Sequence, residues 1–227
     1  DGIVNFDNLT PGIYHLTELG APQGYEKANT NWTVTVTKDG KIYIRDNNPG
    51  GTVPDTGAKW QKVKDGTSGT KDGNSQVQGT PVANRLDTRI TEVNPKAGKF
   101  RQVYIINKQP EELRNPYFEI HSQQENRPLN LGNTNIVSLV TVDRGSTPDN
   151  LINPGAKVEY DTQVYAKNDG FDRIKITPKN LSGNQALALT IESTIGNSGN
   201  VGTGIDFVNY DGYNKFWMAE YYESFDK

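Results

Sequence analysis

Apolar and polar residues alternate over short segments of this chain, and no long stretch repeats apolar residues at helical spacing. Alternation with a period of two, in segments rich in β-branched and aromatic residues, predicts half-buried β-strands. The pattern is clearest over 32–37 and 100–107. Further strands are expected over 3–6, 13–19, 41–45, 86–93, 117–121, 136–142, 156–165, 172–177, 186–194, 205–210 and 216–222.

Turn-forming residues separate these segments. Asp39-Gly40 lies between two predicted strands and is a strong signal for a tight hairpin turn. Pro, Gly and Asn punctuate the later strands at spacings that are typical of a β-sandwich. Apolar residues make up only 33% of the chain, which also suits many turns and loops better than helices. The sequence therefore predicts an all-β fold built from immunoglobulin-like β-sandwich domains.

One segment interrupts this pattern. Residues 49–84 are rich in Gly, Asn and Ser and contain few apolar residues. A loop of this length without structure of its own is unusual inside a compact domain, so we expect a linker or an insertion. This divides the chain into a first domain over 1–48, with a possible extension to 109, and a second domain over 85–227.

Charge and cysteine content exclude several classes of function. The formal net charge is −3 with both signs interspersed, and no basic patch indicates nucleic-acid binding. The absence of cysteine excludes disulfides, thiolate metal sites and a cysteine nucleophile. No apolar run is long enough to span a membrane. The aspartates in predicted loops have no spacing diagnostic of calcium, so neither a metal site nor a cofactor is predicted.

The segment 14–25 carries the most specific motif. It resembles the E-box of the Cna B-type domains of Gram-positive surface adhesins and pilins, in which a strand glutamate is followed by Ala-Pro-x-Gly-Tyr. Because the chain starts inside this domain, we expect it to be a fragment. The residues that agree with the motif are Tyr14, Leu16, Glu18, Ala21, Pro22, Gly24 and Tyr25.

The resemblance implies a spontaneous isopeptide bond between a lysine and an asparagine or aspartate. Glu18 would be the assisting acid, kept protonated by burial while it polarises the acceptor carbonyl. Asn107 is the first candidate acceptor because it ends an apolar strand, although it could simply belong to the second domain; Asn47 is the alternative. The donor lysine is expected upstream of Asp1, with Lys62 and Lys64 as stand-ins.

Residues from about 85 to the end resemble the last ligand-binding immunoglobulin-like domain of fibrinogen- and collagen-binding adhesins of Gram-positive cocci. The resemblance rests on segments 101–107, 187–193 and 208–216. In that family the final segment becomes a latch that adds a strand to a neighbouring domain. Aromatic residues are enriched at binding hot spots, so the aromatic ending could contact a ligand. The candidates are Tyr210, Tyr213, Phe216 and Trp217.

The two resemblances together imply an extracellular, cell wall-anchored adhesin. Its expected partners are a host extracellular-matrix or plasma protein, of the fibrinogen, collagen or fibronectin class, and neighbouring adhesin domains. A structural stalk or pilin module without its own ligand is the alternative. We expect no enzyme beyond a single autocatalytic bond-forming event, and no paired carboxylates indicate a carbohydrate-active enzyme.

Overall fold

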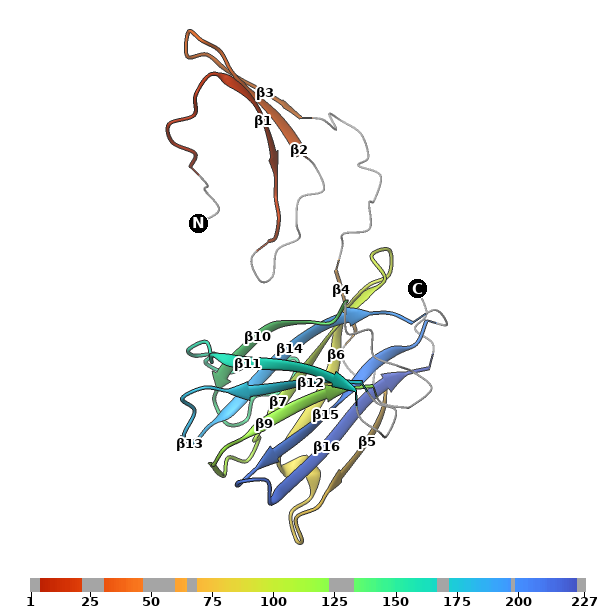
Figure 1. Ribbon diagram of the computed structural model, residues 1–227. Helices are drawn as coiled ribbons and strands as arrows, with labels where there is room; N and C mark the ends of the chain where they lie inside the picture. Colours follow the sequence, from red (N-terminus) through yellow and green to blue (C-terminus); the bar gives the residue numbers. More distant parts are fainter. Residues whose placement is uncertain are drawn as a thin grey trace. The chain divides into compact units, whose positions relative to one another are not determined.

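The computed structural model describes residues 5–21, 31–46, 60–64, 69–122, 133–166, 172–196 and 199–223. Within these residues the ordered structure consists of β-strands and one short 3-10 helix, η1 (Val82–Asn84). The all-β prediction is confirmed. The chain divides into two compact units, Asp1–Trp60 and Gln61–Lys227 (Figure 1).

The first unit contains a three-stranded antiparallel sheet in the order β1-β2-β3. Its strands are β1 (Gly12–Thr17), β2 (Asn31–Val36) and β3 (Ile42–Asp46). Strands β2 and β3 form the hairpin that Asp39-Gly40 predicts. Gly40 has a φ of 81°, a conformation that glycine adopts without strain, and the Thr37 hydroxyl donates a hydrogen bond to the Asp39 carboxylate at 2.5 Å.

The second unit is a β-sandwich of two antiparallel sheets, with strand orders β10-β14-β7-β6-β4 and β11-β12-β9-β15-β16-β5. A two-stranded pair, β8 with β13, accompanies them. The bounds are β4 (Gln61–Lys62), β5 (Thr70–Ser75), β6 (Leu86–Asn94), β7 (Lys99–Ile106), β8 (Glu112–Leu113), β9 (Tyr117–His121), β10 (Asn135–Val142), β11 (Tyr160–Ala166), β12 (Asp172–Pro178), β13 (Gly183–Asn184), β14 (Ala186–Thr194), β15 (Val201–Asn209) and β16 (Asn214–Tyr222).

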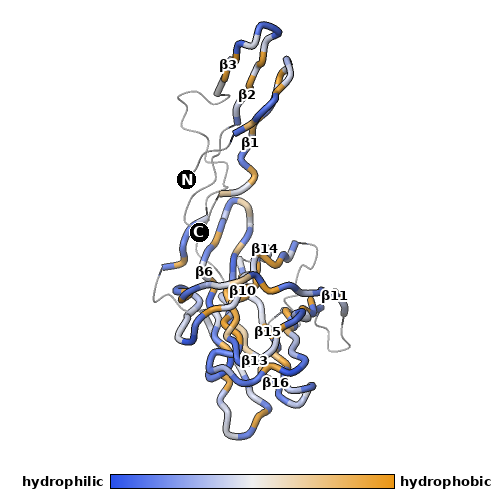
Figure 2. The backbone as a smooth tube through the Cα atoms, turned by 90° about the vertical axis from the view of Figure 1, so that its left-hand side faces the viewer, coloured by the Kyte–Doolittle hydropathy of each residue, from blue (hydrophilic) through white to orange (hydrophobic). Residues whose placement is uncertain are grey.

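The core of the sandwich forms because alternate residues of both sheets point inward. Phe118, Phe207 and Phe216 come from three neighbouring strands and are nearly inaccessible to solvent. The Phe207 ring lies between the other two, with centroids 5.9 Å from Phe118 and 5.8 Å from Phe216. Hydrophobic positions accordingly recur along the strands, whereas the turns between them are mostly hydrophilic (Figure 2).

A buried polar network also joins the two sheets. The Gln102 side-chain oxygen on β7 accepts hydrogen bonds from the Thr203 backbone N–H at 2.9 Å and from its hydroxyl at 2.8 Å. The Gln102 amide donates to the Thr88 hydroxyl at 3.0 Å, and the Tyr104 hydroxyl lies 2.5 Å from that of Thr203. All four side chains are fully buried, so their mutual bonds replace the lost bonds to water.

The sandwich begins earlier in the sequence than the expected domain boundary. Within 49–84, which we expected to be a linker or an insertion, β4 pairs with β6, β5 pairs with β16, and η1 follows. The polar composition of β5 gave no strand signal. The strand lies at the edge of its sheet and is held by main-chain pairing with β16. An edge strand does not require alternating apolar side chains, so a polar sequence can form it.

Candidate functional site

The strand that carries the predicted E-box presents one half-buried side. In β1, the side chains of Tyr14 and Leu16 are half-buried, whereas those of the intervening residues are exposed. Tyr14 lies opposite Val34 and Leu16 lies opposite Trp32 on β2, so these four side chains share one face of the sheet. Glu18 follows β1 and is also half-buried. It therefore continues the alternation that puts it on this apolar side.

Several residues of the motif and one predicted reaction partner of Glu18 lie outside the described residues. These are Pro22, Gly24 and Tyr25 of the motif and the candidate acceptor Asn47. The role of Glu18 as assisting acid stays a prediction.

Asn107 lies in the second unit, directly after β7, and its side chain is fully buried. Its amide nitrogen donates hydrogen bonds to the backbone carbonyls of Glu111 and Gln185, each at 2.9 Å. Its amide oxygen accepts from the Glu111 N–H at 3.1 Å. Asn107 thus fastens the turn after β7 to the segment before β14. Its role as an isopeptide acceptor stays a prediction, as does that of Lys62 on β4 as donor.

The four aromatic residues predicted to contact a ligand divide into two pairs. Phe216 is 2% exposed and belongs to the core, and Trp217 is half-buried on β16. Tyr210 and Tyr213, in contrast, lie in the turn between β15 and β16 and are 42% and 80% exposed. The guanidinium of Arg114 lies 4.7 Å from the centroid of the Tyr210 ring, which holds one side of this turn. Only the turn tyrosines among these four present large surfaces to solvent.

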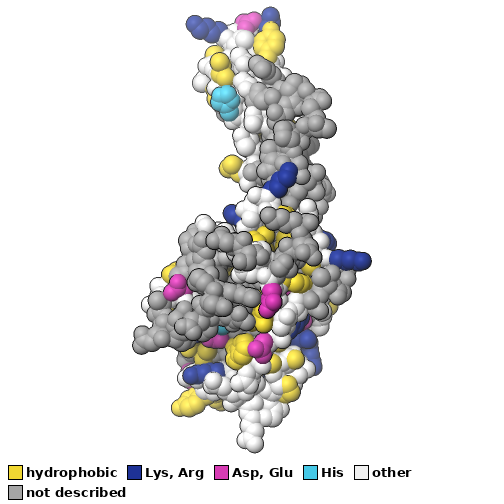
Figure 3. All heavy atoms as spheres, turned by 90° about the vertical axis from the view of Figure 1, so that its right-hand side faces the viewer, with side chains coloured by type: hydrophobic (Ala, Val, Ile, Leu, Met, Phe, Trp, Pro, Cys, Tyr) yellow, Lys and Arg dark blue, Asp and Glu magenta, His cyan; other side chains and the backbone are white. Residues whose placement is uncertain are grey.

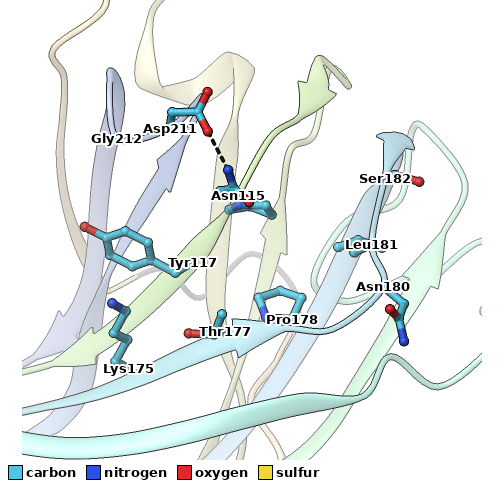
Figure 4. Close-up of a pocket in the computed structure, with 11 residues that line it drawn as sticks. Asn115, Tyr117, Lys175, Thr177, Pro178, Asn180, Leu181, Ser182, Asp211 and Gly212 are labelled. Carbon is cyan, nitrogen blue, oxygen red and sulfur yellow. Dashed lines mark hydrogen bonds between the residues drawn. The ribbon is translucent and has the colours of Figure 1, made fainter.

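An open groove of about 970 Å³ lies beside this turn (Figure 4). Its walls come from the residues before β9, from β12 and the turn after it, and from the β15–β16 turn. Within it, the Lys175 ammonium lies 4.3 Å from the centroid of the Tyr117 ring. The lining residues are Asn115, Pro116, Tyr117, Lys175, Thr177, Pro178, Asn180, Leu181, Ser182, Asp211 and Gly212.

A lysine and two carboxylates meet at the edge of the sandwich where β5, β16 and β6 come together. Lys71 on β5 lies opposite Glu220 on β16. The Lys71 Nζ is 3.2 Å from Oδ1 of Asp87 on β6 and 3.7 Å from Oε2 of Glu220. The Lys71 side chain is 41% exposed and that of Asp87 is 24% exposed, whereas that of Glu220 is completely buried.

Glu220 is buried because it occupies an inward position of β16, in alternation with Phe216 and Met218. Its Oε1 accepts a hydrogen bond from the Gly69 N–H at 3.0 Å, while Oε2 has only the nearby ammonium of Lys71. Burial raises the pKa of the Glu220 carboxyl, and the hydrogen bond from the Gly69 N–H, followed by the charges of Lys71 and Arg89, offsets only part of this effect. Sequence reasoning missed this residue, although the alternation from Phe216 through Met218 predicts its inward position.

A second group of polar and charged side chains lies on the outer side of β11, β12, β9 and β15. The Arg173 guanidinium is 2.8 Å from Oδ2 of Asp206, and Nε2 of His121 is 3.1 Å from Oδ1 of the same residue. The Tyr165 hydroxyl donates a hydrogen bond to the Glu119 carboxylate. Burial is the main cause that raises the pKa of the Tyr165 phenol, and the Glu119 carboxylate raises it further. These interactions join four neighbouring strands, so the charged residues on this side form a cross-strand network.

Other site classes find no support among the described residues. Within the described ranges, no group of three or more His, Asp or Glu side chains is placed to hold a metal ion. No helix of that same part of the chain is long and apolar enough to cross a membrane. On the face drawn in Figure 3, acidic and basic side chains are dispersed among neutral ones, and no patch of a single sign is visible in the coloured area.

Comparison with known proteins gives one match to a protein family. Residues 1–49 match the family described as SpaA, prealbumin-like fold domain. This segment includes β1, β2 and β3 and the predicted E-box, and it covers less than half of the chain. No curated protein matches the sequence.

Two solved structures show a distant likeness. The serine-rich repeat protein Srr2 from Streptococcus agalactiae is 12% identical with a TM-score of 0.45; the alignment covers 94% of this chain and 76% of that one. The C-terminal domain of the Streptococcus agalactiae AgI/II polypeptide BspA is 12% identical with a TM-score of 0.28, covering 84% of this chain and 57% of that one. Scores this low do not establish a common fold, and no function is transferred from them.

Proposed function

We propose that this chain is part of a Gram-positive surface protein of the adhesin or pilin type, extracellular and anchored to the cell wall. The observation that carries the proposal is the E-box strand. Residues 1–49 match a prealbumin-like domain family, and Glu18 follows Tyr14 and Leu16 on the half-buried side of that strand. A carboxyl at such a position needs a partner or a chemical role.

The role we propose for Glu18 is to assist one isopeptide bond, with no turnover of an external substrate. Intact-mass measurement on a chain extended upstream of Asp1 tests this. A lysine and an asparagine that join release ammonia, so the mass falls by about 17 Da. Glu18→Ala is expected to lack this 17 Da loss, and Thr17→Ala, an exposed neighbour, is the matched control that should retain it. Absence of the 17 Da loss in the unsubstituted chain contradicts the proposal.

The adhesive function we propose is binding of a host extracellular-matrix or plasma protein through the exposed turn that holds Tyr210 and Tyr213. Binding of the chain to immobilised fibrinogen, collagen and fibronectin tests it, with Tyr213→Ala as the variant. Loss of binding in this variant supports an adhesin. Absence of binding to all three proteins favours the alternative, a structural stalk or pilin module with no ligand of its own.

A second candidate for covalent stabilisation lies within the sandwich, and the contacts of Lys71 favour it. The reaction requires a lysine, a carboxyl acceptor and a buried acid, and Lys71, Asp87 and Glu220 supply all three within hydrogen-bonding or near-hydrogen-bonding distance. Lys71 would pass a proton to Asp87, and its Nζ would attack Cγ. Protonated Glu220 would donate a proton to the carbonyl oxygen and later recover one.

The balance of this reaction is simple. The Nζ–Cγ bond forms, one Cγ–Oδ bond breaks, and the ammonium and carboxylate together release one water molecule. The bond would join β5 of one sheet to β6 of the other. It needs no oxidant, metal or cofactor, and it occurs once per chain.

A further inference from the structure

We infer that the groove beside the β15–β16 turn is a binding site for an oligosaccharide. The inference goes beyond the proposed binding of a host protein, because it assigns a different class of ligand to a different set of residues. It rests on four features of the groove, namely the tight turns of its walls, its mixture of polar groups, its apolar surface and the position of its floor in the sheet.

The walls are fixed by tight turns. Asn115, Asn180 and Asp211 have φ values of 45°, 53° and 54°, and Gly212 has a φ of 90°. These conformations are typical of specific turns. The backbone N–H of Asp211 also donates to the carbonyl of Arg114 at 3.0 Å, which ties two of the walls together. The backbone of these two walls is therefore joined before any ligand binds.

One carboxylate is oriented toward the groove by two partners. Oδ2 of Asp211 is 3.2 Å from the Arg114 guanidinium, and Oδ1 accepts a hydrogen bond from the Asn115 amide at 2.5 Å (Figure 4). Each carboxylate oxygen has two lone pairs, so Asp211 retains capacity to accept from a ligand hydroxyl. A fixed carboxylate beside an amide is a good receptor for neighbouring hydroxyl groups.

The remaining polar groups are mostly neutral. Thr177 and Ser182 supply hydroxyls, Asn115 and Asn180 supply amides, and Lys175 is the one ammonium among the lining residues. Phosphate-binding sites use several guanidinium or ammonium groups or a helix N-terminus, and this groove has neither. Apolar drug-like ligands need predominantly hydrophobic walls. A hydroxyl-rich ligand, neutral or with one carboxylate, fits this composition best.

Apolar surface completes the match to a sugar. Pro116, Pro178 and Leu181 line the groove together with Tyr117. The Tyr117 phenol is neutral at physiological pH and can both donate and accept a hydrogen bond. Sugars combine hydroxyl edges with apolar C–H faces, and they contact sites that combine both kinds of surface.

The position of the floor argues against strand addition to it. The floor includes β9 and β12, and each of these strands has a hydrogen-bonded neighbour on both sides. An extended peptide gains affinity mainly from main-chain hydrogen bonds to a free sheet edge. These two strands have no free edge, so the floor offers a ligand side chains rather than main chain.

The test uses the full chain on an array of immobilised oligosaccharides, both neutral and sialylated, followed by titration of the best ligand in solution. We expect selective binding. Asp211→Asn and Thr177→Val are each expected to weaken it by about tenfold or more, as for loss of a hydrogen bond to a charged or buried group. Asp72→Asn, on β5 at the opposite edge of the same sheet, is the matched control and is expected to bind normally. Circular dichroism of each variant verifies its fold.

Absence of binding to every oligosaccharide overturns the inference, and so does binding that both groove variants leave unchanged. The proposed host-protein binding is separated by a second arm, in which fibrinogen and fibronectin are compared before and after enzymatic removal of their glycans. Binding that survives deglycosylation, with no binding on the array, upholds the host-protein proposal and overturns the saccharide site. Binding lost on deglycosylation and weakened by Asp211→Asn supports the saccharide site.

Discussion

Lys71 and Glu220 lie opposite each other on the paired strands β5 and β16, with Nζ and Oε2 3.7 Å apart. The lysine is half exposed at the edge of the sandwich, whereas the glutamate is fully buried. Because the same Nζ is 3.2 Å from Asp87, one ammonium joins carboxylates of both sheets. This arrangement leads directly to the first prediction.

The intact mass of the folded chain is expected to be lower than the sequence mass by about 18 Da, the mass of one water released by Lys71 and Asp87. Trypsin would then yield a branched peptide that joins residues 65–85 to residues 86–89. Glu220→Gln is expected to retain the full mass because the amide cannot exchange protons as the acid does. Lys71→Arg keeps the ion pair but cannot form the bond.

Asp87→Asn is the sharpest variant for this reaction. Its unreacted chain is about 1 Da lighter, but it would release ammonia instead of water and give the same cross-linked product as the unsubstituted chain.

Variants that cannot form the bond are expected to lose roughly 3 kcal/mol of the free energy of unfolding, as for loss of a disulfide that closes a loop of similar length. If the unsubstituted chain has the mass calculated from its sequence and yields no branched peptide, the three residues form an ion pair only.

Tyr104 is expected to make unfolding sensitive to alkaline pH. Burial raises the pKa of its phenol far above the ordinary value. A raised pKa in the folded state means that the contribution to stability is complete below the pKa of the unfolded chain, about 10, and is lost as the pH rises above it. Ultraviolet absorbance should show exposed tyrosines ionising first, and Tyr104 ionising only together with the loss of circular dichroism.

Tyr104→Phe serves as the control for this titration. It removes the ionisable group and the contact with the Thr203 hydroxyl at 2.5 Å, at a cost of about 1 kcal/mol near neutral pH. The late ionisation step should disappear in this variant. A titration in which all tyrosines ionise before the fold is lost would contradict the buried position of Tyr104.

Gly202→Ala is expected to destabilise the sandwich by about 3 kcal/mol, for two combined reasons. Its φ of 125° strains any other residue, and an added Cβ would lie 2.7 Å from the Cα of Tyr221 and against the backbone oxygen of Glu220. Gly183→Ala separates the two effects. It has a φ of 81° but open space around the added Cβ, so a smaller cost of about 1–2 kcal/mol is expected. Urea unfolding of both variants measures the difference.

Truncation of Phe216 is expected to lower the free energy of unfolding strongly, whereas truncation of Tyr213 is expected to change it very little. Phe216→Ala should destabilise the protein by about 3–5 kcal/mol because the ring is buried against Phe207. Tyr213→Ala should change stability by less than about 0.5 kcal/mol because the ring is 80% exposed. Unfolding and host-protein binding, measured on the same two variants, show which aromatic residue contributes to stability and which contributes to binding.

Much of the sandwich could be predicted from the sequence because its central strands bury one face. Alternation marked the strand at 100–107, which the structure gives as β7 (Lys99–Ile106), and the Asp39-Gly40 turn marked the hairpin of β2 and β3. The polar strand β5 could not be found in this way, because pairing at a sheet edge leaves no hydrophobic period. The second unit starts earlier still, at Gln61, with the short strand β4 that pairs with β6.

The candidate sites were harder to predict, because they depend on residues that are distant in sequence. Phe216 looked like a contact residue among other aromatics, but the inward alternation that it shares with Met218 places it in the core. Glu220 follows the same alternation, although its charge by itself suggests exposure. The groove brings together residues near 115, 178 and 211, and no local pattern indicates that these turns are neighbours.

The pairing of β5 with β16 determines how the sandwich would respond to pulling. The strands are antiparallel, and Thr70 at the start of β5 lies opposite Tyr221 near the end of β16. Tension applied through the chain on both sides of the sandwich would first load the short β4–β6 pairing at Gln61 and Lys62. Once β4 is released, the tension would open the hydrogen bonds between β5 and β16 from this end, one pair after another. The next pair along is Lys71 with Glu220. A covalent bond from Lys71 to Asp87 would stop the opening at its second step and pass the load to the interior of the sheet.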